Sequence, residues 1–558
     1  MNPAPVATEA SAPEPWKKAS FGGRRHWWAV ALLFLIAACL RFAWLGIKPP
    51  HFDEGVNGWF LDQMQRTGFY HYDPANYHGP FHFYVLFLAQ SLFGRDVIAL
   101  RVPLVLVNLG TLWMILLYAR FVGRRVAFLA AAAFSVSSGM LFYSRYAIHE
   151  AWLVLALVVT IWGLFEWWTS ASRRGVWAIV GGVTLMILTK ETYVIHLAAL
   201  GLACGTLRLL ECWSPSEPEA AMTPAPHRLK MRDYLQPVAL GLLAIFFFYS
   251  GGFFDFGALK GLYETFAPWF ETGIVKGDHA KPWYYWLQLA VRHEWPALLG
   301  LLFCVRALFP GMNRFSRYLA IYGCGAAVAY SIVPYKTPWC VITILWPFFF
   351  LFGEALLAFA RGGGRWRPAL ACLLTVFLLA FSLFDAIRLN YLHPAEPQKE
   401  VFVPSLAERW LTRAHLISLE ARYIYVQTLD DLFKLTVPLK EMTRRDPRLL
   451  HEPAHILLSS YHPLPWVLGE LTRVGYYGES DDFPETMDGA FLVVEEERVP
   501  TVEAALKESY FVTPFQLRDG MSGGKLYLNY RWFHEAFPGR APERVGPLQT
   551  LDEEEPVQ

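Results

Sequence analysis

The sequence predicts a polytopic α-helical membrane protein that carries a small α/β domain at its C-terminal end. Two observations support this class. Hydrophobic residues make up 54% of the 558 residues, charged residues only 17%, and 22 residues are tryptophan, a balance typical of membrane proteins. The apolar residues come in blocks up to about Arg388, after which the chain becomes polar. A membrane domain followed by a polar domain is therefore expected.

Charge and cysteine content exclude several other classes. The net charge of +1 gives no overall field that would attract a nucleic acid, so no nucleic-acid partner is expected. The seven cysteines lie almost entirely in apolar blocks and include no CxxC pair. Neither a disulfide framework nor a zinc site is indicated.

The membrane domain is predicted over residues 27–393, after a disordered cytoplasmic segment at 1–26. Its first apolar run is too long for a signal peptide and lacks a clear cleavage site, so it is expected to remain as the first span. A span needs roughly 17–25 mostly apolar residues, which gives about eleven spans, or as many as 12–13. The expected spans are Trp27–Leu45, Val97–Ala119, Val126–Tyr143, Ala151–Thr169, Val176–Thr189, Thr192–Leu210, Leu235–Ser250, Tyr285–Phe309, Tyr318–Val333, Trp339–Ala360 and Ala369–Ile387.

The distribution of basic residues orients these spans. With the N-terminus in the cytoplasm, every loop expected inside carries a basic cluster, such as Arg173 and Arg174, whereas external connections are poorer in lysine and arginine. The apolar segment Phe81–Phe93 is only about half a span long and is predicted to lie at the interface. We therefore expect a multi-pass protein of the cell's inner (plasma) membrane, in contact with its lipids, with the C-terminal region outside.

Residues 394–536 are predicted to form the extracytoplasmic α/β domain. Strand-like segments at 422–427, 455–460, 490–496 and 525–532 alternate with helix-like segments at 429–435, 464–471 and 502–509. The domain contains no glycine-rich phosphate loop and no nucleophile elbow, which disfavours an active site within it. The tail 537–558 is expected to be disordered.

The first external connection, 47–96, holds most of the candidate functional residues. Asp53 and Glu54 open the segment 53–65, which is predicted to form an amphipathic helix on the membrane. Either carboxylate could simply cap that helix. Capping does not explain a second polar group, "HYDPANYHGP", later in the same connection. The candidates for substrate binding here are His51, Asn57, Asp73, Tyr77 and His78.

Three further connections place charges at the same face of the membrane. "YSRYAIHEAW" contributes Arg145, His149 and Glu150, "LTKETY" contributes Lys190 and Glu191, and "VPYKTPW" contributes Lys336. Each residue alone could be a snorkelling side chain or a local ion pair. Their convergence on one face favours a shared site, in which acids act on a hydroxyl and bases hold a phosphate.

These motifs resemble the membrane-embedded GT-C glycosyltransferases. "DEG" after the first span, followed by "DPANYHGPFHFYVLFLAQSLFGRDVIALRVP", is similar to the first external loop of their bacterial protein mannosyltransferase and aminoarabinose transferase branch. "SRYAIHE" and "LTKE" resemble two later motifs of that branch. "YHGP" with "LPWVLGEL" and "VGYYGE" is similar to a narrower prokaryotic family that is associated with flippase activity and glycosylation.

The resemblance implies an inverting transfer of a sugar from a polyprenyl-phosphate donor to a hydroxyl of a glycan, lipid or protein acceptor. By position, Asp53 corresponds to the first-loop acid that activates the acceptor, with Glu54 beside it, and Glu150 to the second-loop acid. Arg145 and Lys190 would then lie near the donor phosphate.

Two points lie outside that correspondence. Lys336 is not covered by the motifs, and its predicted role in binding the phosphate rests on the membrane topology alone. Tyr77-His78-Gly79-Pro80 stands where the aminoarabinose branch has Tyr-Glu-Lys-Pro-Pro, so a metal site is not carried over from that branch. No cofactor is required by this reasoning, and a divalent metal stays open, because His, Asp and Glu together do not establish one.

Two other functions remain open at this point. One is a flippase, or a flippase-associated transporter, of lipid-linked sugars; the spans show no repeat, and their charges gather at one face rather than at the midplane. The other is a noncatalytic partner that holds a glycosylation complex together through the C-terminal domain. Transfer of labelled sugar from a lipid-phosphate donor separates an enzyme from a flippase, which yields no product.

Overall fold

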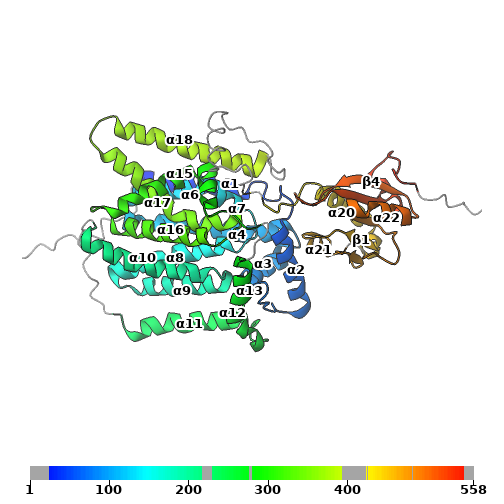
Figure 1. Ribbon diagram of the computed structural model, residues 1–558, viewed down its shortest axis with the longest axis horizontal. Helices are drawn as coiled ribbons and strands as arrows, with labels where there is room; N and C mark the ends of the chain where they lie inside the picture. Colours follow the sequence, from blue (N-terminus) through cyan, green and yellow to red (C-terminus); the bar gives the residue numbers. More distant parts are fainter. Residues whose placement is uncertain are drawn as a thin grey trace, which may run out of the picture.

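The computed structural model describes residues 24–216, 229–274, 279–392, 423, 425–479, 482–518 and 520–545. A bundle of long helices occupies residues 24–392, and a smaller domain with a β-sheet follows it. In Figure 1 the long helices run side by side along the longest axis of the molecule, and the sheet domain lies beyond one end of the bundle. That end of the bundle also holds the short helices α2, α3, α12 and α13, which are described below.

Six segments of the described chain are long and apolar enough to cross a membrane, so the chain is a multi-pass membrane protein. They are Val97–Val122 (α4 and α5), Glu150–Ser170 (α8), Tyr193–Trp213 (α10), Met231–Tyr249 (α11), Pro338–Arg361 (η4 and α17) and Arg367–Tyr391 (α18 and η5). Other helices are shorter or less apolar: α1 (Arg24–Phe42), α9 (Arg173–Thr189), α15 (Trp295–Phe303) and α16 (Arg314–Ile332). The count of eleven spans stays a prediction.

Two expected spans are interrupted. The expected span 126–143 consists of α6 (Arg124–Val136) and α7 (Ser138–Tyr143), and the expected span 285–309 consists of α14 (Tyr285–His293), α15 and the 3₁₀ turn η3 (Cys304–Leu308). Both breaks meet at one polar contact, because the hydroxyl of Ser137 donates to Glu294 over 2.7 Å and the amide of Gly139 donates to the same carboxylate over 2.6 Å. Amides freed at the first break are thus satisfied by a side chain from the second.

Small residues let the long helices approach closely. A Cβ atom on Gly182 of α9 would lie 2.1 Å from the hydroxyl of Thr160 on α8, and one on Gly300 of α15 would lie 1.9 Å from the carbonyl oxygen of Phe348 on α17. Such contacts are the usual basis of helix packing in membranes, where burial of apolar surface gives no driving force. The segment around α17 is the most enclosed, with 78% of its apolar window buried.

The connection after α1 folds into helices, as the sequence predicts. The predicted amphipathic helix 53–65 is α2 (Phe52–Thr67), and the predicted interfacial helix is α3 (Phe81–Phe93). The connection after α11 contributes η2 (Phe256–Lys260), α12 (Gly261–Glu264) and α13 (Phe266–Ile274).

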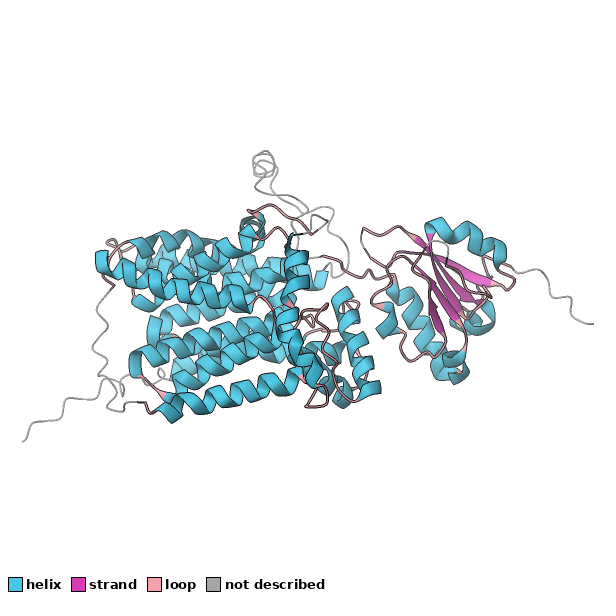
Figure 2. Cartoon of the chain, turned by 60° about the horizontal axis from the view of Figure 1, so that its bottom comes forward, coloured by secondary structure: helices cyan, strands magenta, loops and turns pink. Residues whose placement is uncertain are grey.

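The C-terminal domain contains a five-stranded sheet with strand order β2-β1-β3-β5-β4. β1 (Ala454–Leu457) pairs in parallel with β2 (Val474–Tyr476) and β3 (Phe491–Glu495), and β5 (Gly524–Asn529) pairs antiparallel with β3 and β4 (Tyr510–Phe515). Figure 2 shows helices on both sides of this sheet. The helices are α20 (Leu432–Arg445), α21 (Leu464–Val467), α22 (Val499–Ala505) and α23 (Tyr530–Phe533), with 3₁₀ turns η6 (Pro447–His451), η7 (Glu496–Arg498) and η8 (His534–Ala536).

One expected strand, 422–427, is wrong, and β2 and β4 escaped prediction. Arg422 and Ile424 lie outside the described residues, but the other four residues do not pair as a strand and instead lie against the helix bundle. The Tyr423 hydroxyl donates to Glu294 over 2.9 Å, and the Gln427 side chain accepts from the Tyr146 hydroxyl over 2.5 Å. Their aromatic and amide groups find partners in the membrane domain, and these outweigh the strand propensity of the segment.

Two glycines of α2 form a docking surface for the C-terminal domain. A Cβ atom on Gly55 would lie 2.3 Å from the Cα atom of Pro463, and one on Gly58 would lie 2.1 Å from the indole ring of Trp466. The Trp466 indole donates to Gln90 over 3.1 Å, and Arg95 donates to the carbonyl oxygen of Trp466 over 3.0 Å. The C-terminal domain therefore contacts the helix that bears Asp53.

We expect the substitution Gly58→Leu to separate the C-terminal domain from α2, because its side chain would occupy the position of the Trp466 ring. Hydrogen exchange followed by mass spectrometry should then show faster exchange in α2 and α21. Gly181→Leu is the matched control, because an added Cβ on Gly181 of α9 meets nothing within 4 Å. Unchanged exchange in Gly58→Leu would contradict this docking surface.

Candidate active site

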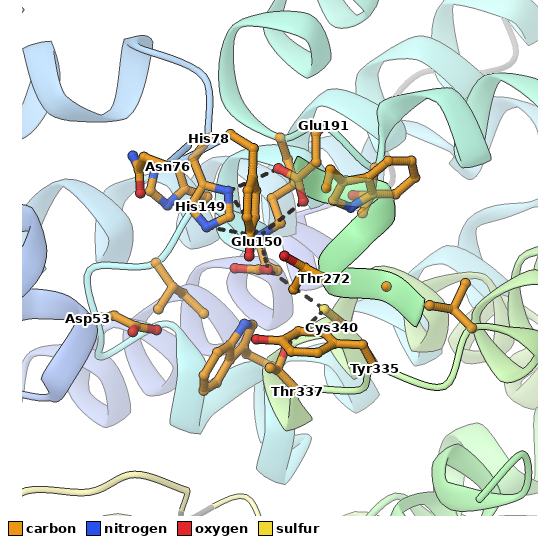
Figure 3. A pocket seen from close by; sticks show the side chains of 18 of the residues that line it. Asp53, Asn76, His78, His149, Glu150, Glu191, Thr272, Tyr335, Thr337 and Cys340 are labelled. Atoms are coloured by element: carbon orange, nitrogen blue, oxygen red, sulfur yellow. Dashed lines mark hydrogen bonds and ion pairs between the residues drawn. The ribbon is translucent and has the colours of Figure 1, made fainter. Parts of the chain in front are cut away.

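A cavity of about 510 Å³ opens at the end of the bundle nearest α2 and α13. Its walls come from α2, the connection between α2 and α3, the start of α8, the connection between α9 and α10, α13, and the connection between α16 and α17. Figure 3 shows the polar side chains that point toward it. The polar lining residues include Asp53, Asn57, Tyr77, His78, His149, Glu150, Lys190 and Glu191. Four separate connections of the membrane domain thus meet at one cavity, as the sequence predicts.

Asp53 lies at the start of α2, where His51 caps the helix. The ring nitrogen Nδ1 of His51 accepts from the amide of Asp53 over 3.2 Å, while Nε2 lies 2.8 Å from the carbonyl oxygen of Tyr425 and therefore donates to it. These two bonds assign a neutral ring to His51. The Asp53 carboxylate is 37% exposed, and its nearest basic group is the His51 ring, at 4.0 Å. Asp53 is therefore held by its backbone and leaves its carboxylate available to a ligand in the cavity.

Glu54, predicted to share the chemistry, has a different environment. Its side chain is 0% exposed and does not line the cavity. Arg101 on α4 binds it through two hydrogen bonds of 2.9 and 2.7 Å, and the amides of His51 and Ala147 each donate to it over 2.9 Å. Four donors therefore occupy the carboxylate. Burial alone would raise the pKa of Glu54, but Arg101 and the two amides stabilise the ionised form more strongly, so the pKa is lowered. We assign Glu54 to positioning α2 and not to proton transfer.

A compact charged cluster lies on another wall of the cavity. The ammonium of Lys190 is 3.0 Å from Glu150 and 3.6 Å from Glu191, and His78 Nδ1 is 2.9 Å from Glu191. Figure 3 places Asp53 apart from His78, Glu150 and Glu191, across the cavity. The contact between His78 and Glu191 depends on the glycine that follows His78. Gly79 packs directly on the end of α9, where an added Cβ atom would lie 2.3 Å from the carbonyl group of Leu188, so a larger residue would push this segment away.

The carboxylates determine the charge state of Lys190. Burial alone would lower the pKa of Lys190, but Glu150 and Glu191 raise it well above its ordinary value, so the side chain is an ammonium at all physiological pH values. Burial conversely opposes ionisation of Glu191, but Lys190 and His78 lower its pKa. Lys190 and Glu191 are therefore a charged pair at the centre of the cluster.

His149, which the sequence places beside Glu150 but to which no role was assigned, also lines the cavity. It precedes Glu150 at the start of α8, is 5% exposed, and its Nε2 atom has no hydrogen-bond partner among the described residues. Its ring lies 4.5 Å from that of His78 and 4.1 Å from that of His82. Burial, with a smaller contribution from these two rings, lowers the pKa of His149 well below its ordinary value, so it faces the cavity as a neutral ring. Its position next to Glu150 in "AIHEAW" was the available indication.

Two predicted phosphate-binding residues lie elsewhere. Arg145 does not line the cavity; its guanidinium donates to the carbonyl oxygens of Arg41, Ala43 and Trp44 over 3.0, 2.7 and 2.9 Å. Lys336 is also absent from the cavity wall, and its ammonium donates to the carbonyl oxygens of Val333 and Lys281. Burial lowers the pKa of Lys336 to about 8. Both cations satisfy backbone carbonyls that helix ends leave unpaired, which an isolated motif does not reveal.

Of the remaining predicted residues, some line the cavity and others do not. Asn57 lines the cavity and donates to the carbonyl oxygen of Ala147 over 2.8 Å, and Tyr77 lines the cavity with a φ of +44°, in the left-handed region. Asp73 lies outside the cavity wall, where its carboxylate accepts from the amide of Ala75 over 2.9 Å and stabilises a turn. Thr272 and Tyr335, two further cavity residues that lay outside the sequence prediction, come from connections distant in sequence.

The donor set does not fit a metal ion. Within the described ranges, no group of three or more His, Cys, Asp and Glu residues is arranged to hold one. Lys190 stands between Glu150 and Glu191, where its ammonium supplies the positive charge that the two carboxylates require. We derive no step through a metal.

Comparisons with known proteins give one family match and two structural neighbours. Residues 77–210, which include His78, His149, Glu150, Lys190 and Glu191, match the family described as dolichyl-phosphate-mannose-protein mannosyltransferase. The chain is similar in structure to ArnT from Cupriavidus metallidurans bound to undecaprenyl phosphate, with a TM-score of 0.55 and 14% sequence identity over 90% of this chain and 98% of ArnT. ArnT in the apo state gives a TM-score of 0.53 and 14% identity over 89% and 96% of the two chains. Comparison with curated proteins finds no match.

Proposed function

We propose that this chain, a membrane glycosyltransferase of the GT-C type, transfers a sugar from a polyprenyl-phosphate donor to an acceptor hydroxyl with inversion at the anomeric carbon. The observation that carries the proposal is the division of the cavity. The Asp53 carboxylate lies on one side, 37% exposed and, among the described residues, with only the His51 ring near it, at 4.0 Å. The ammonium of Lys190 lies within a charged cluster on another side. This arrangement suits a reaction in which a proton and an anionic leaving group depart in different directions.

The donor would bind at the Lys190 side of the cavity. Apolar side chains on the same walls provide a surface for prenyl units: Ile195, Trp269, Phe270, Ile274, Ile332 and Val333. The phosphate would approach the ammonium of Lys190, whose contact with Glu191 is the longer of its two ion pairs, at 3.6 Å. His78 borders both groups and can add a second positive charge when protonated, which offsets the repulsion from Glu150 and Glu191. ArnT, the structural neighbour, binds undecaprenyl phosphate.

The acceptor would bind at the Asp53 side. The acceptor oxygen forms a bond to the anomeric carbon while the bond from that carbon to the phosphate oxygen breaks. Asp53 takes the hydroxyl proton, and polyprenyl phosphate leaves with the electron pair toward Lys190. One base and one displacement are sufficient for this stereochemistry, and no covalent intermediate on the enzyme is required. Asn57, Tyr77 and His149 border the space between the two ends and would contact the sugar.

We further propose that the reaction takes place on the extracytoplasmic face of the inner membrane. The basic clusters of the sequence orient the chain with its N-terminus in the cytoplasm, and the cavity opens at the end of the bundle that carries the C-terminal domain. A polyprenyl-phosphate sugar is an activated donor, so the reaction needs no nucleotide on that side of the membrane.

The test is transfer in detergent from polyprenyl-phosphate donors that carry radiolabelled sugars, with a delipidated cell-envelope fraction as acceptor. We expect label in the acceptor fraction, release of polyprenyl phosphate, and an anomeric configuration in the product, read by NMR, opposite to that of the donor. A retained configuration would contradict the single displacement. Movement of the donor across vesicle membranes without any transfer of label would show that the protein is a flippase and not a transferase.

A further inference from the structure

Arg518 of the C-terminal domain is a buried guanidinium beside the cavity. Its side chain is 6% exposed and lies over the ring of Phe52, with the guanidinium carbon 4.6 Å from the ring centroid. Phe52 and the next residue, Asp53, both line the cavity. The backbone of Arg518 is fixed by a β-bridge to Thr428, so the side chain is carried by an ordered part of the domain.

This guanidinium has no counter-ion among the described residues. Within them, no carboxylate lies within 4.0 Å of Arg518, and its Nε atom has no hydrogen-bond partner. Its side chain donates to the Ser460 hydroxyl. A buried charge is costly unless it is paired, so an unpaired arginine is uncommon where it serves only stability. Burial lowers the pKa of Arg518, and the one carboxylate that opposes this effect is Asp53.

A second polar group of the same domain also lies against Phe52. The ring of His462 is 5.4 Å from the Phe52 ring, and its Nδ1 atom is buried without a hydrogen-bond partner among the described residues. Two unsatisfied nitrogens of the C-terminal domain therefore lie near the residue that precedes Asp53. Neither side chain lines the cavity, but both contact Phe52, which does, so a ligand bound to them would reach Asp53 from the side of this domain.

We propose that Arg518, with His462 beside it, binds an anionic group of the acceptor and thereby selects acceptors in which a carboxylate or a phosphate lies close to the reacting hydroxyl. The proposal rests on the proposed function, since it gives Arg518 a part in presenting a hydroxyl to Asp53. An arginine matches either anion through paired hydrogen bonds. The anion would supply the counter-ion that Arg518 lacks.

Docking of the two domains does not account for Arg518. The contacts of Gly55 with Pro463 and of Gly58 with Trp466, together with the hydrogen bonds of Arg95, already join α2 to the C-terminal domain. An uncharged side chain over Phe52 would add contact area there without the desolvation of a charge.

The experiment measures binding without turnover. Isothermal titration calorimetry of the full chain at low ionic strength would use D-glucuronate as a carboxylate probe, glycerol 1-phosphate as a phosphate probe and D-glucose as the neutral match. We expect an anionic probe to bind the natural protein more tightly than glucose, and Arg518→Gln to weaken anion binding about 10- to 100-fold with little effect on glucose. The probe whose affinity falls more in Arg518→Gln identifies the class of acceptor: D-glucuronate indicates a carboxylated glycan, and glycerol 1-phosphate indicates a phosphorylated polyol.

The controls separate recognition from folding. Arg531→Gln removes an exposed arginine that lies over Trp532, with 5.3 Å to the ring centroid, and should change neither affinity. Arg518→Lys keeps the charge and should restore part of the anion affinity. Equal anion affinities in Arg518→Gln and the natural protein would overturn the proposal. So would an Arg518→Lys variant that binds anions no more tightly than Arg518→Gln and shows faster hydrogen exchange in α21, because Arg518 would then serve to dock the two domains. A chain that binds anions through Arg518 but transfers no sugar would refute the proposed function and leave this site standing.

Discussion

Replacing Asp53 by asparagine is expected to lower sugar transfer about 10²- to 10⁴-fold, the range that a positioned general base contributes. Asparagine has nearly the same shape as aspartate and keeps the amide that donates to His51, so α2 should still begin at the same residue. The change removes only the group that takes the acceptor proton. The measurement is the rate of transfer per folded molecule in detergent, together with binding of the polyprenyl-phosphate donor. Donor binding should be unchanged, because Lys190 pairs with Glu150, which Figure 3 shows apart from Asp53.

Asp73 provides the matched control for this prediction. It belongs to the same connection, but its carboxylate accepts from the amide of Ala75 and lies outside the cavity wall. Asp73→Asn should therefore retain transfer. Natural rates in Asp53→Asn, or equal losses in the two variants, would show that the proton leaves by another route.

The helices of the membrane domain could be predicted because an apolar run of sufficient length has few alternatives. Every expected span overlaps a helix, and the short helices α2 and α3 were anticipated from a periodic pattern and from a length of half a span. The interruption at Ser137 could not be predicted, because it depends on a hydrogen bond to Glu294, 157 positions away. The interruption at Glu294 has a local signal that the prediction overlooked, since Pro296 at the start of α15 disfavours helix for the residues before it.

The candidate site was predictable at the level of connections but not of side chains. Asp53 and Glu54 are adjacent, and a helix turns by about 100° per residue, so one faces the cavity and the other faces Arg101 on α4. A single sequence does not show which face is which. Similarly, Arg145, Lys190 and Lys336 all stand at helix ends, yet only Lys190 meets carboxylates; the other two meet backbone carbonyls. The C-terminal residue Arg518 becomes a candidate only when its neighbours are known.

The pair of Glu54 and Arg101 provides the second large effect. We expect Glu54→Gln and Arg101→Met each to destabilise the protein by about 3–5 kcal/mol, because each leaves a buried charge without its partner. In the double variant no charge remains buried at this place, so the double variant should lose about 3 kcal/mol less than the sum of the single losses. It should not regain the full stability, since Arg101 also donates to the carbonyl oxygens of Leu45, Lys48 and Pro49. Unfolding of the purified variants in mixed detergent measures these differences.

Transfer by the double variant decides what Glu54 does. If Glu54 only positions α2, the folded fraction of Glu54→Gln/Arg101→Met should transfer sugar within about tenfold of the natural rate, because the loss of one positioning contact costs far less than the loss of a base. The exposed pair Arg445 and Glu441 of α20, with side chains 49% and 48% exposed, is the reference for a weak interaction and should show a coupling of roughly 0.3–0.5 kcal/mol. A double variant that folds and binds the donor but transfers no sugar would show that Glu54 takes part in catalysis. In that case the two adjacent carboxylates would act together, and the four hydrogen bonds on Glu54 would have to rearrange when substrate binds.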